Sequence, residues 1–115
     1  MTANLDRLRK ICLALPDATE TTNFGHPFFR VNDKTFCVYH GKPEEPAIAF
    51  KMLRTETGIF LEDPRFFKTP YMHHNGWVSI HAQGKLDWKE IKELVKAGYD
   101  LTACARPARK SAKRT

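Results

Sequence analysis

Residues 28–39 read FFRVNDKTFCVY, and this stretch decides the fold. Phe28–Val31 and Thr35–Tyr39 are rich in aromatic and β-branched residues, which are typical of strands. Between them, Asn32 and Asp33 favour a tight turn, because both side chains tolerate left-handed backbone and form local hydrogen bonds. The stretch therefore predicts a β-hairpin from which the rest of the sheet extends.

The chain on either side of this hairpin supplies three more strands and three helices. Further strands are expected at about 19–24, 47–51 and 77–81, with a loop at 41–46. Helices are expected at 3–15, 54–62 and 88–103, the last one capped by Asp87. The short connections exclude βαβ winding. The predicted class is α+β, a mostly antiparallel five-stranded sheet with N-terminal, short middle and C-terminal helices packed on it.

The positive charge of the chain is concentrated at its C-terminal end. The net charge is +6, and five of the 19 basic residues lie in 104–115, where there is no acid. This leaves 14 basic and 13 acidic residues in 1–103, so this part is almost neutral. We assign 1–103 to a single domain, and 104–115 to a basic tail that we expect to be disordered because it lacks apolar periodicity.

Targeting signals and cysteine usage indicate where the protein works. No stretch approaches the length of a membrane span, and the first ten residues carry charges where a signal peptide needs an apolar run. Cys12 falls at an apolar helical position and Cys37 inside a strand, so we interpret both as small buried hydrophobic residues. Unpaired buried cysteines suit a reducing compartment. We expect a cytoplasmic protein without a membrane partner.

The residues offer little support for catalysis. His73 and His74 are adjacent and would tend to diverge, and the spacings typical of zinc ligands are missing from the sequence. Cys37 lies between Phe36 and Val38, where a thiol is more often inert than nucleophilic. No glycine-rich loop precedes a helix. We therefore expect a protein that is not an enzyme and that uses neither a metal nor another cofactor.

One loop gathers groups that could form a pocket. Residues 69–77 contain Tyr71, His73 and Trp77, and His26 comes from another loop. Two interpretations remain open. Trp77 can belong to the core while Tyr71 packs over the sheet edge, or the four side chains can form a small pocket or a stacking platform for a base or ring.

The order of motifs along the chain resembles the MmcQ/YjbR family. The resemblance covers about residues 5–103 and rests on these segments: 15–16 (LP), 21–27 (TTNFGHP), 29–31 (FRV), 34–36 (KTF), 63–67 (DPRFF), 76–78 (GWV) and 87–88 (DW). It implies the family's α+β fold. Members are commonly described as DNA-binding through a double-wing arrangement, in which β-hairpins flank a helical element. The resemblance thus implies a DNA-binding role.

Basic side chains on the predicted hairpins and loops are the candidates for DNA contacts. They are Arg30, Lys34, Lys42, Lys51 and Arg54 in the domain, with Arg109 and Lys110 in the tail. Such cations neutralise phosphates and position a protein without reading sequence. An ordinary solvated surface is the alternative, because Asp33, Glu44 and Glu45 lie among them.

Two functional hypotheses follow from these features. The first is a monomeric domain that binds double-stranded DNA with low sequence specificity through hairpin wings and basic loops. The second is a protein- or small-ligand-interaction module that uses the 69–77 loop and His26.

Overall fold

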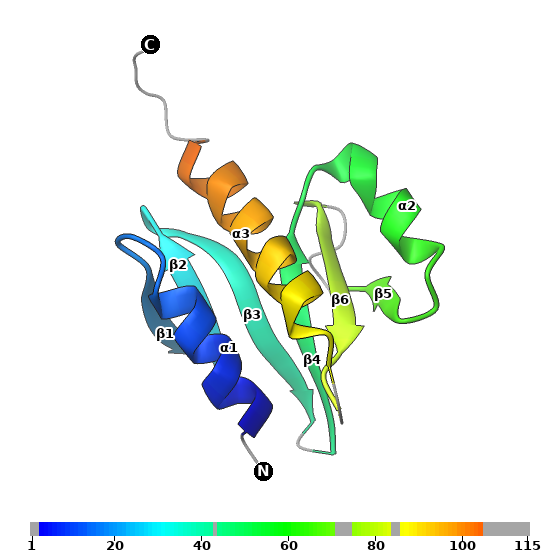
Figure 1. The fold of residues 1–115 in the computed structure, drawn as a ribbon, viewed down its shortest axis with the longest axis horizontal. Helices are drawn as coiled ribbons and strands as arrows, with labels where there is room; N and C mark the ends of the chain where they lie inside the picture. The colour runs from blue at the N-terminus through cyan, green and yellow to red at the C-terminus, as the bar shows by residue number, and fades with distance from the viewer. Residues whose placement is uncertain (1–2, 43, 71–74, 84–85, 105–115) are drawn as a thin grey trace.

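The protein forms one antiparallel sheet with two long helices across one face (Figure 1). The computed structural model describes residues 3–42, 44–70, 75–83 and 86–104. The elements are α1 (Ala3–Leu13), β1 (Thr19–Asn23), β2 (His26–Val31), β3 (Lys34–Lys42), β4 (Glu45–Lys51), the 3-10 turn η1 (Arg54–Glu56), α2 (Thr57–Leu61), β5 (Phe66–Lys68), β6 (Trp77–His81) and α3 (Trp88–Cys104). The strand order is β1-β2-β3-β4-β6-β5. The predicted α+β class is confirmed.

The hairpin predicted at 28–39 is present. Asn32 has φ 54° and Asp33 has φ 65°, while Val31 pairs with Lys34 across the turn. Two successive left-handed residues give the backbone twist that suits a two-residue hairpin. The short polar side chains of asparagine and aspartate allow this conformation at little cost.

Two details of the predicted sheet are wrong. It has six strands rather than five, because Phe66–Lys68 forms the short edge strand β5 on β6. This segment has no alternating pattern of its own and becomes a strand through pairing with its neighbour. The loop predicted at 41–46 is also shorter than expected. Gly41, with φ 94°, continues β3 opposite Pro46, where a Cβ would collide with the Glu45 carbonyl oxygen.

The core lies between the sheet and the helices. Cys12 of α1 and Cys37 of β3 are both fully buried and free, which confirms their interpretation as small hydrophobic residues. Burial raises the pKa of the Cys12 thiol far above its usual range, so this thiol stays protonated and unreactive. Other fully buried members of this core are Leu8, Phe29, Phe36, Ile48, Phe50, Val78, Ile91 and Val95.

The two faces of the sheet have different surroundings. On β2, the side chains of Phe29 and Val31 are buried in the core, so those of His26, Phe28 and Arg30 point to the other face. The small apolar cluster on that second face contains only strand residues, and no described helix packs there. We call it the open face of the sheet.

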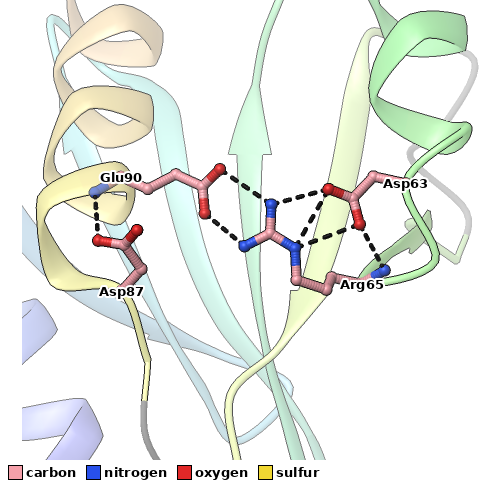
Figure 2. A network of polar contacts seen from close by, with 4 residues as sticks. All are labelled: Asp63, Arg65, Asp87 and Glu90. Carbon is pink, nitrogen blue, oxygen red and sulfur yellow. Dashed lines mark hydrogen bonds and ion pairs between the residues drawn. The ribbon is translucent and has the colours of Figure 1, made fainter.

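A polar network ties the start of α3 to the segment before β5 (Figure 2). The Arg65 guanidinium donates to Asp63 Oδ2 at 2.7 Å and to Glu90 Oε1 at 2.7 Å. Asp87 Oδ1 accepts the backbone N–H of Glu90 at 3.2 Å, which confirms the predicted helix cap. Hydrogen bonds from the Arg65 side chain, and then from its backbone N–H, hold the pKa of Asp63 below its usual value.

Replacing Arg65 with methionine is expected to lower the melting temperature by no more than a few degrees, because the ion pairs lie at the surface. The folded-state pKa of Asp63 is depressed, so its stabilising contribution is complete above the ordinary pKa of 3.8 and is lost as the pH falls through the lower, folded value. The difference between wild type and variant should therefore shrink in acid. Thermal melts from neutral pH down to about pH 3 test this, with Lys89→Met, another exposed cation, as the control.

Candidate functional site

Four of the five cations predicted in the domain line one groove at one end of the sheet. They are Arg30, Lys34, Lys51 and Arg54, and the groove measures about 870 Å³. The groove is built where the β2–β3 turn, the β4–η1 junction and the last turn of α3 meet, at the end of the molecule where Figure 1 shows α3 ending. We call it the basic groove.

The remaining predicted cations lie elsewhere. Lys42 ends β3, whereas Lys34 begins it, so the two lie at opposite ends of a nine-residue strand. Arg109 and Lys110 lie outside the described residues. Leu101 and Thr102 of α3 line the basic groove, so this helix ends beside it.

The described lining of the basic groove holds four cations and one acid, the exposed Asp33. Burial lowers the pKa of Lys51, and the charges of Arg54 and Lys34 lower it further. The Lys51 ammonium donates to the Asn75 carbonyl oxygen, and Arg30 donates to the Asp33 carbonyl oxygen. None of the four forms a salt bridge with another residue that the structure describes. The groove thus carries a net positive charge, which the Asp33 carboxylate reduces.

Two polar atoms of the groove residues are buried without a partner. They are Arg30 Nε and the hydroxyl oxygen of Thr102, and neither makes a hydrogen bond within the described chain. Thr102 is only 5% exposed. A buried polar atom without a partner is costly and rare. The net positive charge of the groove suits an anionic group.

A second concavity lies on the open face. It measures about 610 Å³ and is lined by Phe24, His26, Phe28, Val38, His40, Thr69 and Pro70. We call it the aromatic hollow. Phe28 pairs with Val38 across β2 and β3, and the two histidines lie two residues further along the same strands. Strand pairing therefore brings His26 beside His40.

Hydrogen bonds fix the position of His40. Its Nε2 lies 2.9 Å from Ser79 Oγ, which lies 2.7 Å from Thr69 Oγ1. The ring reaches across β4, where Ala47 and Ala49 leave room for it. Burial lowers the pKa of His40, and the neighbouring His26 lowers it further. Ser79 is fully buried, so we interpret its contact with His40 as structural.

The residues of the predicted pocket have different locations. His26 meets Thr69 and Pro70, the first two residues of the 69–77 loop, in the aromatic hollow. Trp77 is 4% exposed and packs with Val38 and Ala49, which confirms its interpretation as a core residue; its edge lines the basic groove. Tyr71 and His73 lie outside the described residues.

Sequence reasoning missed Phe24 and His40 as site residues. Phe24 was expected to end a strand, but it turns the chain between β1 and β2 with φ 55°, and its side chain is 95% exposed. The glycine that follows Phe24 was the available signal for a turn. For His40, the signal was its spacing of two from Val38 along a strand.

The described residues contain no cluster of three or more histidine, cysteine or acidic side chains that could hold a metal ion. Within the same residues, no helix is both long enough and apolar enough to cross a membrane.

Comparisons with known proteins place this fold. The chain is similar to a Deinococcus radiodurans protein with a DUF419 domain, at 19% identity and a TM-score of 0.76, over 91% of this chain and 82% of that one. It is also similar to a Pseudomonas syringae protein, at 21% identity and a TM-score of 0.68, over 84% of this chain and 97% of that one. No curated protein matches it. The YjbR family model matches residues 13–101, and the chain therefore belongs to the YjbR family.

Proposed function

We propose that the domain is a non-enzymatic DNA-binding module that holds the phosphate backbone in the basic groove, with little base specificity. The supporting observation is the convergence of Arg30, Lys34, Lys51 and Arg54 from the β2–β3 hairpin and the β4–η1 junction, in a groove whose described lining holds one acid, Asp33. Maintaining such a cluster costs stability through repulsion, and a bound polyanion offsets that cost. The β2–β3 hairpin that borders the groove would act as one wing.

The tail and the cell compartment belong to the same proposal. α3 ends beside the groove, so the cations that follow it in the sequence are close enough to bind the same polyanion and add affinity without adding specificity. We propose that the protein acts as a monomer. We also propose that it works in the cytoplasm, because the free Cys12 and Cys37 suit a reducing compartment.

A titration of short fluorescent DNA with the full chain at several salt concentrations tests the groove. Four phosphate contacts to duplex DNA predict a slope of log K against log salt of about −3 to −4, and tail contacts steepen it. The key variant replaces the tail cations Arg106, Arg109, Lys110, Lys113 and Arg114 with glutamine. It should bind more weakly but keep the slope that the groove contributes. Complete loss of binding in this variant would assign the activity to the tail and reject the groove.

A protein- or small-ligand-interaction module is the second candidate. It is favoured by the aromatic hollow, in which His26 meets the start of the 69–77 loop. The rings of Phe24 and Phe28 suit a flat ligand, and a nucleic-acid base is one such ligand. This chemistry connects the second candidate with the first.

A further inference from the structure

We infer that the preferred ligand of this domain is single-stranded nucleic acid, with one base in the aromatic hollow and the adjacent phosphates in the basic groove. The inference rests on the proposed function of the groove and specifies the form of its ligand.

The hollow and the groove are both lined by side chains of β2. His26, Phe28 and Arg30 follow one another along the open face of β2, at a spacing of about 7 Å. The first two line the hollow and the third lines the groove. Phe28 also packs in one cluster with Trp77, whose edge lines the groove. A ligand that occupied both sites would run along β2, with its ring at Phe28 and its negative charge at Arg30.

Phe24 is difficult to explain by folding alone. Its side chain is 95% exposed, so it adds almost nothing to the core. Its φ of 55° lies in the left-handed region, which bulky residues avoid and which glycine or asparagine would adopt more easily. Strain that packing does not explain is often found at functional sites. At the rim of the hollow, the exposed ring can stack on a base.

The shape of the hollow selects an unpaired base. A base inside a duplex is stacked on both faces and hydrogen-bonded to its partner, so its ring cannot enter a concavity beside the backbone. An unpaired base can enter with its faces against Phe24 and Phe28. The imidazole of His26, and the ring nitrogen of His40 that does not contact Ser79, can then hydrogen-bond to its edge. Stacking tolerates every base, which agrees with a site of low sequence specificity.

The decisive variant is Phe24→Asn in the full chain. Asparagine suits left-handed backbone, so the melting temperature should stay the same or rise. Affinity for single-stranded oligothymidine should fall about tenfold, because a stacked base is lost. Affinities for a duplex and for an abasic oligomer of equal length, which keeps the phosphates, should not change. Ile59→Asn replaces another exposed apolar side chain, 70% exposed on α2, and should change none of these affinities.

The outcomes separate this inference from the proposed function. If Phe24→Asn leaves oligothymidine binding unchanged while charge reversal in the groove weakens it, the base site is wrong and the groove stands. If groove reversal has no effect on any DNA, the proposed function fails, and with it the nucleic-acid ligand. If thymidine monophosphate binds as tightly as the oligomer and equally depends on Phe24, the ligand is a free nucleotide and the inference of a strand is overturned.

Discussion

Replacing Phe50 with alanine is expected to lower the free energy of unfolding by about 3–5 kcal/mol. Phe50 is fully buried on the central strand β4, paired with Cys37 on one side and Val78 on the other. Removal of its ring leaves a cavity between the sheet and the helices that the neighbouring strands are too constrained to fill. Small domains have a total stability of about 5–15 kcal/mol, so the variant should be close to unfolding at 37 °C. Urea denaturation followed by tryptophan fluorescence measures the change.

Phe24→Ala is the matched control for this experiment. It removes the same atoms from a side chain that is 95% exposed, so stability should change by no more than about 0.5 kcal/mol. Equal effects at both positions would contradict the burial of Phe50 and the exposure of Phe24.

Local sequence patterns predicted the elements whose signals are local. The hairpin followed from Asn32 and Asp33, because the turn conformation depends on those two residues themselves. The last helix followed from Asp87 and the apolar spacing after it. β5 was missed because Phe66–Lys68 is a strand only through its pairing with β6. That dependence on a distant segment leaves no pattern in the three residues.

The sequence predicted individual residues of the candidate site, but it did not predict which of them lie together. Lys34 and Lys51 are brought together because β3 and β4 are antiparallel neighbours, so the start of one lies beside the end of the other. The same topology separates Lys42 from Lys34. The hollow required more information than strand order. The left-handed turn at Phe24 depends on tertiary structure. So does the position of His40, which reaches Ser79 across the small side chain of Ala49 on the strand between them.

Reversing two charges in the basic groove, Lys34→Glu with Arg54→Glu, is expected to lower affinity for DNA about 100-fold or more at low salt. Two phosphate contacts are lost, and two carboxylates are placed beside Arg30 and Lys51. The slope of log K against log salt should become shallower by about 2. The same fluorescence titration measures both quantities.

The same double variant should lose affinity for DNA but keep or gain stability of the fold. In the wild type, burial and the charges of Arg54 and Lys34 lower the pKa of Lys51 from its ordinary value of 10.5. The unfolded chain therefore binds more protons between the two values, and this group makes stability rise as the pH approaches 10.5. With carboxylates in place of its cationic neighbours, Lys51 loses that repulsion. The variant should melt at the same or a higher temperature than the wild type, with less increase in stability at alkaline pH.

A control with the same total charge distinguishes a groove from general attraction. Lys89→Glu with Lys92→Glu also removes two cations and adds two anions, but both residues are exposed near the start of α3, at the opposite end of the helix from Leu101. General attraction depends on net charge and would weaken binding equally in the two variants. If the groove contacts phosphates directly, Lys34→Glu with Arg54→Glu should lower the affinity for DNA at least tenfold more than Lys89→Glu with Lys92→Glu. Equal losses would show that net charge, and not the arrangement of cations at the end of the sheet, governs binding.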